Sequence, residues 1–202
     1  MADVVEWQGT TEARSMVQED EVAALSRRYG QPGRHAFRIQ ADDYIYSYRW
    51  RKDLDRRAEV VFAIEDRDQG IWVHNKPHYP VHIFRLPSGG VHWDEDVEHA
   101  LLREVAEETG LEVSVKRFLA LIEYQFYRDD STVTFASYVF HLHSDGGTPI
   151  FQEGEPISAF FAVPPVRLAQ IARDLRDLNG DRRGWGQWRS LVHDVVADYM
   201  VN

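Results

Sequence analysis

The sequence predicts an α+β fold in which helices pack on a mixed β-sheet. Short runs rich in β-branched and aromatic residues alternate with segments of helical periodicity, and glycine, proline and charged residues separate them. With 202 residues, 44% of them hydrophobic, the chain is long enough for one main core with extensions or for two small domains. One main domain is favoured.

The first half of the chain predicts one helix followed by four strands. Residues 19–29 have apolar side chains at helical spacing, and the segment "GQPG" ends that pattern. Aromatic residues alternate in "DYIYSYRW", residues 43–50, which predicts a strand. Three shorter strands are predicted in "AEVVFAIED", "GIWVHN" and "VHIFRL".

The second half predicts a hairpin, a further strand and two helices. Two long β-rich runs, at about 113–127 and 132–143, are joined by "RDDS" as in a hairpin. The run "ISAFFAV" predicts a strand that two prolines end, and a helix follows at about 166–178. The tail predicts an amphipathic helix with one apolar face, formed by Trp188, Leu191, Val192, Val195 and Tyr199.

Composition excludes several classes of function. The 33 acidic and 23 basic residues give a net charge of -10, which argues against a general nucleic-acid surface. No run approaches the roughly 18 apolar residues of a membrane span, and the N-terminus is acidic instead of resembling a leader. The absence of cysteine rules out disulfides and thiolate chemistry. The absence of cysteine does not itself fix the compartment, and a cytoplasmic location is the default expectation.

The segment "GGVHWDEDVEHALLREVAEETGL", residues 89–111, places acids where an ordinary amphipathic helix does not have them. At about 100° per residue, Glu104 and Glu108 project among the apolar positions, while Glu107 lies to one side. All three stand near the helix end at Gly110, where the dipole disfavours carboxylates. A hard divalent cation would favour such a cluster. The alternative is a solvated surface turn.

The residues before this helix favour a ligand site over a surface turn. Gly89 and Gly90 predict a turn that brings backbone groups close to a ligand, and the helix then starts at an N-cap, Asp96 or alternatively Asp94. Such a turn and the carboxylates of the helix would face the same ligand.

By position, the segment resembles the Nudix box, GX5EX7REUXEEXGU, in which U is a bulky aliphatic residue. Gly89, Glu95 and the run from Arg103 to Leu111 fill every specified position, and we call residues 89–111 the box. The resemblance implies a Nudix-like α/β/α sandwich over about 57–165. Residues 1–56 would then be an N-terminal extension of helix and aromatic strand, and residues 166–202 a C-terminal helical segment that packs on the core.

The resemblance also implies an activity, namely Mg²⁺- or Mn²⁺-dependent hydrolysis of a nucleoside diphosphate linked to another group. By position, the metal ligands would be Glu104, Glu107 and Glu108, with a backbone carbonyl from the Ser88 to Gly89 loop. Glu95 and Arg103 would form an ion pair that holds the loop against the helix. Carboxylate-held metals suit this chemistry because attack on a diphosphate requires charge neutralisation and in-line positioning.

The general base is open between the box and a later loop. Family members use either a box glutamate or one from a later segment, and "FQEGEPISAFF" offers Glu153 and Glu155 just before a strand. We favour Glu153 or Glu155 over Glu104, while an exposed turn is the alternative for both.

Two residues are candidates for substrate contact. Tyr127 lies 17 residues beyond Gly110, near where dinucleoside polyphosphate hydrolases of the family carry a tyrosine, although strand packing is the favoured explanation of an aromatic there. His92 flanks the glycines and is a candidate phosphate contact. Whether the substrate is a dinucleoside polyphosphate, ADP-ribose, a nucleotide sugar or a nucleoside triphosphate stays open.

Two functional hypotheses follow, an enzyme and a non-catalytic Nudix-like domain that binds a nucleotide or metabolite as a regulator. The intact carboxylates favour the enzyme, because a binder has no chemical need for three clustered acids. Family relatives often dimerise and cover the substrate site with extensions, so we expect a homodimer. In a monomer, the aromatic segment from Tyr44 to Trp50 would be an intramolecular cover.

Overall fold

The structure is a computed structural model, and it describes residues 4–6, 16–51, 56–150, 154 and 156–201. Its strands are β1 (Val4–Glu6), β2 (Gly33–Gln40), β3 (Arg56–Glu65), β4 (Ile71–Asn75), β5 (Ser88–His92), β6 (Ser114–Arg128), β7 (Ser131–His143) and β8 (Ala159–Val163). Its helices are α1 (Glu19–Tyr29), α2 (Asp43–Arg49), α3 (Val97–Thr109), α4 (Leu168–Arg176) and α5 (Arg183–Val201), with 3-10 turns η1 (Pro165–Arg167) and η2 (Gly180–Arg182).

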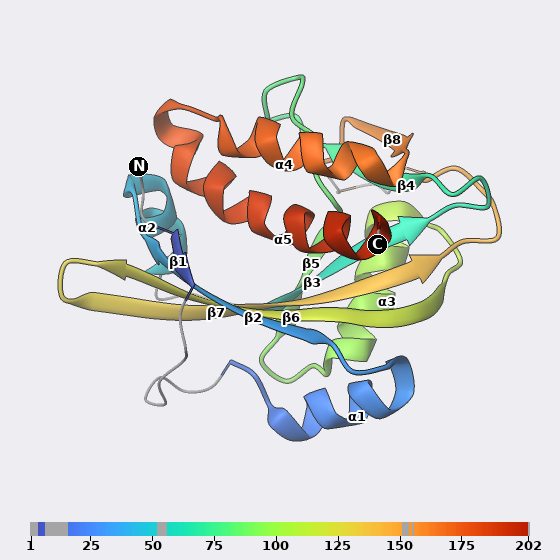
Figure 1. The fold of residues 1–202 in the computed structure, drawn as a ribbon, viewed down its shortest axis with the longest axis horizontal. Helices are drawn as coiled ribbons and strands as arrows, with labels where there is room; N and C mark the ends of the chain where they lie inside the picture. The colour runs from blue at the N-terminus through green and yellow to red at the C-terminus, as the bar shows by residue number, and fades with distance from the viewer. Residues whose placement is uncertain (1–3, 7–15, 52–55, 151–153, 155, 202) are drawn as a thin grey trace.

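The strands form one mixed sheet that is covered by helices on both faces. The strand order is β1-β2-β6-β7-β3-β4-β8, with β5 paired to β3. Strands β2 and β6 and strands β3 and β7 run parallel, while the other neighbours are antiparallel. Helices α4 and α5 cover one face and α1 and α3 the other (Figure 1). This arrangement confirms the predicted α/β/α sandwich.

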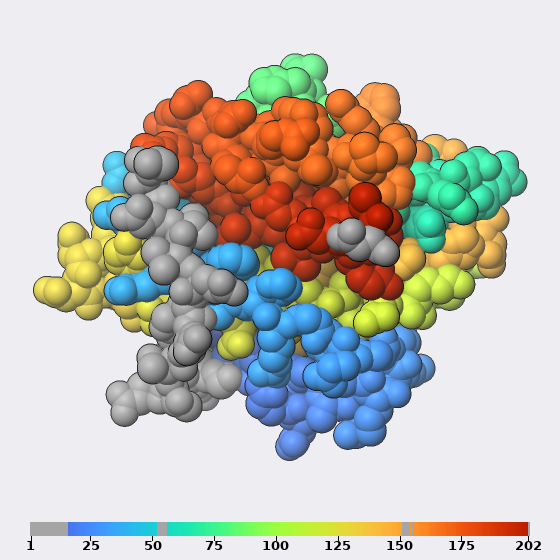
Figure 2. Space-filling view, in the orientation of Figure 1, coloured from blue at the N-terminus to red at the C-terminus, as the bar shows by residue number. Residues whose placement is uncertain are grey.

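Strand β3 lies at the centre and separates two hydrophobic cores. Val60, Phe62 and Ile64 pack toward α1 and α3, whereas Val61 and Ala63 pack toward α4 and α5. Because helices cover both faces, the strand is buried at every position from Arg57 to Ile64 instead of alternating between buried and exposed. In the space-filling view the C-terminal segment forms one layer over the upper half of the molecule, and α1 lies on the opposite side (Figure 2).

Several predicted elements are confirmed. Helix α1, strands β3, β4 and β8, the β6–β7 hairpin and helices α4 and α5 form where the sequence indicates. The turn of the hairpin includes Asp129, which has a positive φ of 50° and lies within the predicted "RDDS". Local periodicity therefore identifies most of the elements.

The strand predicted at 43–50 is wrong, because this segment forms helix α2. Asp42 caps the helix by accepting a hydrogen bond from the backbone N–H of Ile45 at 2.9 Å. The rings of Tyr44 and Tyr48, one helical turn apart, lie 6.3 Å from each other and nearly parallel. Alternation at i and i+2 also places aromatics at i and i+4, so the tyrosine pattern alone does not distinguish helix from strand.

The strand predicted in "VHIFRL" is also wrong, since only an isolated bridge between Arg85 and His74 forms there. The Asn75 side chain donates to the carbonyls of Pro80 and Ile83 and so replaces part of a strand ladder. Conversely, strand β2 was not predicted. Its pattern is largely polar and exposed, and its parallel pairing with β6 determines its conformation.

Helix α5 is present, but its buried face is rotated from the predicted one. Trp188 and Val192 are buried as expected, whereas Tyr199 is 38% exposed. Two polar residues of the same helix, Arg189 and His193, are also buried. Both have specific partners, which offset the cost of burying polar groups: Arg189 binds Glu59, and His193 accepts from the backbone N–H of Leu86.

Candidate active site

Helix α3 begins and ends where the box predicts. Asp96, not the alternative Asp94, is the N-cap, and its carboxylate accepts from the backbone N–H of His99 at 2.8 Å. Gly110 follows the helix with a left-handed φ of 64°, a conformation that glycine adopts without strain. The helix therefore presents its last two turns, which hold the acids, in a fixed orientation.

The three box glutamates are buried to different degrees. The side chains of Glu108 and Glu104 are 3% and 13% exposed, while that of Glu107 is 50% exposed. The helical angles predicted this difference, because Glu104 and Glu108 share the apolar side of α3. Two carboxylates thus lie in the protein interior near the negative end of a helix dipole.

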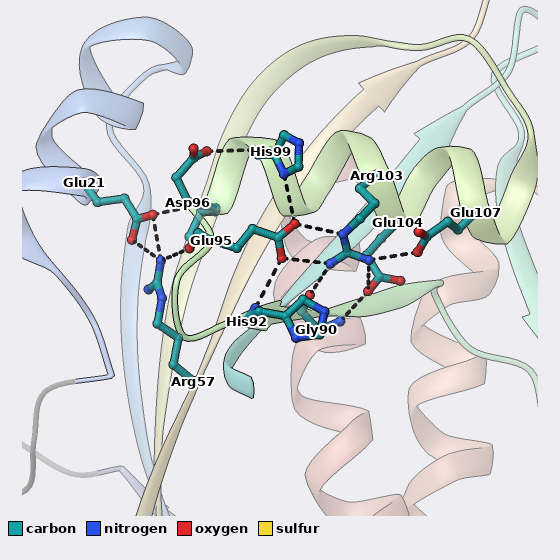
Figure 3. Close-up of polar contacts among 11 residues, drawn as sticks. Glu21, Arg57, Gly90, His92, Glu95, Asp96, His99, Arg103, Glu104 and Glu107 are labelled. Carbon is teal, nitrogen blue, oxygen red and sulfur yellow. Dashed lines mark hydrogen bonds and ion pairs between the residues drawn. The ribbon is translucent and has the colours of Figure 1, made fainter. Parts of the chain in front are cut away.

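Arg103 connects the box carboxylates to the strand β5 (Figure 3). It binds both oxygens of Glu95, at 2.8 and 2.9 Å, and donates to the backbone carbonyl of Gly90 at 2.9 Å. Its Nη1 also reaches Glu104 at 2.9 Å and Glu107 at 2.8 Å. The expected ion pair between Glu95 and Arg103 is therefore present. The hydrogen bonds that Arg103 donates to Glu95 lower the pKa of the Glu95 carboxyl to about 2.

The glycines before the helix have a different role from the one predicted. Gly89 and Gly90 lie within strand β5, paired with β3, so the expected turn is wrong. A Cβ on Gly89 would lie 1.8 Å from Cδ of Glu104, and Glu104 also accepts from the Gly90 backbone N–H at 2.9 Å. Gly89 is required because the carboxylate approaches the strand closely, not because the backbone turns.

Glu108 lies between Lys76 and His74. One carboxylate oxygen accepts from Lys76 at 2.9 Å, and the other lies 3.8 Å from Nδ1 of His74 with no hydrogen-bond partner among the described residues. Burial raises the pKa of Glu108, although the Lys76 charge opposes this effect. Burial, together with the charges of Arg85 and Lys76, lowers the pKa of His74, so its imidazole is neutral.

The box residues supply the donor types that Mg²⁺ or Mn²⁺ prefers, although their side chains are turned toward cations of the protein. Among the described residues, no group of three or more histidine, aspartate or glutamate side chains is arranged to hold a metal ion. Arg103 and Lys76 hold the carboxylates instead. The unpartnered oxygen of Glu108 and the space that Gly89 leaves for Glu104 fit a bound cation.

Two of the cavities formed by the described residues lie beside the box, and the larger of the two is acidic. It has a volume of about 590 Å³. We call it the acidic cavity, and it is lined by His92, Asp94, Glu95, Asp96, His99, Arg103 and Glu107. Four carboxylates against one arginine make it unfavourable for a polyphosphate.

The smaller cavity has the opposite charge and a volume of about 200 Å³. We call it the cationic cavity, and its charged side chains are Arg56, Lys76, Arg85 and Arg189 together with Glu59. Its aromatic side chains are Tyr44, Tyr48, Tyr79 and Trp185. Because Gly89 also lines it, this cavity adjoins the strand against which Glu104 packs.

Most of the cationic cavity, including its buried ion pair, was not predicted from the sequence. Arg189 donates to both oxygens of Glu59 at 2.7 Å, and the Ser137 hydroxyl donates to the same carboxylate at 2.6 Å. Burial opposes ionisation of Glu59, but Arg189 and Ser137 outweigh it and lower the pKa of that carboxyl. For the ion pair, the sequence signal is an arginine and a histidine four residues apart, next to the apolar stripe of α5. For the aromatic lining, the signal is the predicted cover from Tyr44 to Trp50, which includes two of the tyrosines of the cavity.

The two other predicted residues that the structure describes, Tyr127 and His92, lie on different strands. Tyr127 lies near the end of β6, its ring 4.4 Å from the guanidinium of Arg38, and lines neither cavity. His92 is exposed and lines the acidic cavity. Glu153 and Glu155 lie outside the described residues. A substrate role for Tyr127 and His92 stays a prediction.

The fold and the box together define a class of protein. Residues 54–185 match the model of the NUDIX domain, which is more than half of the 202 residues. The chain therefore belongs to the Nudix family. It is a Nudix hydrolase, and such enzymes act on phosphorus-containing acid anhydrides. The match ends within α5, beyond the predicted limit at 165.

Solved structures with similar folds come from several bacteria. The E. coli ORF135 protein is 27% identical, with 56% of this chain and 76% of that chain covered and a TM-score of 0.42. The E. coli dihydroneopterin triphosphate pyrophosphohydrolase is 14% identical, with coverages of 73% and 97% and a TM-score of 0.49. An ADP-ribose pyrophosphatase from Streptococcus suis is 18% identical, with coverages of 72% and 92% and a TM-score of 0.45. No curated protein matches the chain.

Proposed function

We propose that this Nudix hydrolase is a divalent-metal-dependent pyrophosphohydrolase that cleaves a nucleoside diphosphate linked to another group. One observation carries the proposal: the buried carboxylates of Glu104 and Glu108 lie next to a cavity with four cationic side chains. Cationic side chains bind the phosphates of the substrate, and the carboxylates hold the metal that the reaction requires.

In this proposal Glu104, Glu107 and Glu108 hold Mg²⁺ or Mn²⁺, together with a backbone carbonyl of Ser88 or Gly89. The bound cation would supply charge neutralisation and a water of lowered pKa. Arg103 orients Glu104 and Glu107 through its hydrogen bonds at 2.9 and 2.8 Å. Glu95 in turn holds Arg103 in a bidentate pair, so both are positioning residues for the carboxylates.

For the general base we propose Glu153 or Glu155 over Glu104. The proposal is supported by Pro156, the next residue along the chain, which lines the cationic cavity. Replacing each candidate with glutamine and measuring kcat at saturating Mg²⁺ identifies the base, because its loss costs about 100-fold to 10,000-fold. Both variants retaining full kcat would exclude these two residues and leave Glu104.

The decisive experiment is a substrate panel measured with and without Mg²⁺. It includes ADP-ribose, dinucleoside polyphosphates, nucleotide sugars and nucleoside triphosphates, with release of nucleotide or phosphate as the readout. We expect Mg²⁺-dependent turnover of at least one of these compounds. No turnover on any compound, combined with tight binding of one, would instead show a binding domain.

We further propose that the segments outside residues 57–165 complete the site and that the protein is a homodimer. Helix α2, within 1–56, and helix α5, within 166–202, both contribute side chains to the cationic cavity. No helix in the described part of the chain is long and apolar enough to cross a membrane. Light scattering tests the dimer, and a mass of about 23.5 kDa would contradict it.

A further inference from the structure

The cationic cavity combines positive charge with aromatic rings, although the chain as a whole carries a net charge of -10. Its residues come from α2, the segment after β4, strands β3 and β5, and α5. Its volume of about 200 Å³ lies below the roughly 300–1,000 Å³ of sites that enclose a whole drug-sized ligand. The cavity therefore has room for one end of a substrate.

Arg85 is held in place on one wall of this cavity. Its Nε donates to the Tyr79 hydroxyl at 2.8 Å, and its Nη1 donates to the Leu86 carbonyl at 3.1 Å and to Oγ of Ser88 at 2.8 Å. The second amino group, Nη2, has no hydrogen-bond partner among the described residues. A fixed guanidinium with an unused amino group suits a phosphate oxygen, because little side-chain freedom is lost on binding.

Aromatic rings form the remainder of the lining. Tyr44 and Tyr48 project from the same side of α2, with ring centroids 6.3 Å apart and an interplanar angle of 14°. Tyr79 and Trp185 lie 4.8 Å apart, centroid to centroid. Rings next to cationic side chains are the combination that binds a nucleobase and its phosphates, since bases stack on aromatic faces.

A single carboxylate ties the two helices of this lining together. Asp42 accepts from the backbone N–H of Ile45 at 2.9 Å, at the start of α2, and from the backbone N–H of Gly184 at 2.7 Å, at the start of α5. A Cβ on Gly184 would lie 2.3 Å from the carboxylate, so any larger residue there would displace it. Asp42 does not line the cavity, and its role is to position α2 against α5.

We infer that the cationic cavity is a nucleobase subsite in which Tyr44 and Tyr48 face the base, Arg85 binds the adjacent phosphate, and Asp42 holds the two helices in place. The inference rests on the proposed function and narrows it. The substrate is a nucleoside diphosphate derivative that enters base first, with its scissile anhydride directed toward Gly89 and the box. A phosphate-rich compound without a base is the competing class of ligand.

The test compares two tyrosines of the same helix in the full-length protein. Tyr48→Leu removes a ring from the cavity, whereas Tyr46→Leu removes an exposed ring, 42% accessible, that does not line it. We expect Tyr48→Leu to raise KM for the nucleotide substrate about tenfold or more with kcat nearly unchanged. Tyr46→Leu should leave both constants at the wild-type values, and hydrolysis of inorganic tripolyphosphate should not respond to Tyr48→Leu.

Binding provides a readout that does not need turnover. Titration calorimetry with AMP, GMP, CMP and UMP, and with inorganic phosphate as the base-free probe, measures the subsite directly. We expect at least one nucleotide to bind about tenfold more tightly than phosphate, and Asp42→Ala or Tyr48→Leu to abolish this difference. If Tyr48→Leu does not fold, as judged by circular dichroism, Tyr44→Leu replaces it.

The outcomes separate the inference from the proposed function. If turnover depends on the metal but Tyr48→Leu and Tyr46→Leu have the same kcat and KM, the nucleobase subsite is overturned and the proposed hydrolysis stands. Nucleotide binding that depends on Tyr48 without any turnover would support the subsite and overturn the proposed hydrolysis. Equal binding of phosphate and all nucleotides would overturn the subsite in favour of a base-free ligand.

Discussion

The acidic and the cationic cavity flank the same box, but they differ in charge and in origin. Among the described residues, the acidic cavity, about 590 Å³, is lined by seven residues that all belong to one short segment, 92–107. The cationic cavity, about 200 Å³, is lined by residues that are scattered along the chain between Tyr44 and Arg189. Charge favours the smaller one for a diphosphate, because a cluster of carboxylates repels phosphate unless cations intervene.

We propose that the two groups of residues have different tasks within one site. The contiguous segment supplies the carboxylates and the arginine that orients them, and its geometry follows from one helix and one strand. The scattered segments supply cations and aromatic rings, which we propose contact the substrate. A change in the box should therefore lower the rate on every substrate, whereas a change in the scattered segments should alter which substrate is accepted.

The largest effect is expected from Glu108→Gln, which removes a buried charge next to the cationic cavity. We expect kcat/KM to fall about 1,000-fold on all substrates, because a carboxylate proposed to hold the metal is lost. Steady-state kinetics across the panel and Mn²⁺ binding by calorimetry measure it. Glu112→Gln, an exposed glutamate just after α3, is the matched control and should match the wild type. Unchanged Mn²⁺ binding in Glu108→Gln would refute a metal role.

Gly89→Ala should have the next largest effect. The added methyl group would occupy the position of the Glu104 carboxylate, 1.8 Å from its Cδ, so that carboxylate must move. We expect kcat/KM to fall about 100-fold, as for other misplacements of about 1 Å in active sites. Gly33→Ala is the control, since it adds a methyl group to strand β2 with a nearest contact of 3.3 Å. Equal activity of the two variants would show that Glu104 needs no fixed position.

Arg103→Lys tests the connection between the box carboxylates and β5. Lysine keeps the charge, but its three N–H donors cannot replace the five hydrogen bonds that Arg103 makes. We expect about a tenfold loss of kcat/KM and a loss of about 1–3 kcal/mol in the free energy of unfolding. Urea denaturation and kinetics check both values. An unchanged rate would assign Arg103 to stability alone.

The smallest expected effect is the loss, at acidic pH, of the contribution that the Glu95–Arg103 pair makes to the free energy of unfolding. Arg103 holds the pKa of Glu95 at about 2, below its ordinary value of 4.5. The pair therefore stabilises the fold above pH 4.5, and this contribution is lost as the pH falls toward 2. We expect the difference in unfolding free energy between wild type and Glu95→Gln to shrink over that range. A difference independent of pH between 6 and 2.5, measured in urea, would contradict this expectation.

The box could be predicted from the sequence because its information is local. The positions of Glu104 and Glu108 follow from helical angles, and the Glu95–Arg103 pair is present as expected. The role of Gly89 was misjudged for a physical reason. Glycine is favoured both in turns and where a side chain packs directly against the backbone. The two cases can be distinguished only when the position of the neighbouring side chain, here Glu104, is known.

The cationic cavity could not be predicted for a different reason. The tyrosine pattern of residues 43–50 fits a strand as well as a helix, and the hydrogen bonds of Asp42 to Ile45 and Gly184 show that α2 forms against α5. Likewise, Arg189 is polar in a helix and becomes buried only because Glu59, on a distant strand, binds it.

The amino-acid sequence by itself determined the family, the α/β/α class and the carboxylate helix, because periodicity and fixed spacing act within a few turns of one element. Only the tertiary structure decided which cations and rings gather beside that helix. Their contacts join residues more than a hundred positions apart, as in the pair of Glu59 with Arg189, and such pairing depends on how the sheet and helices pack.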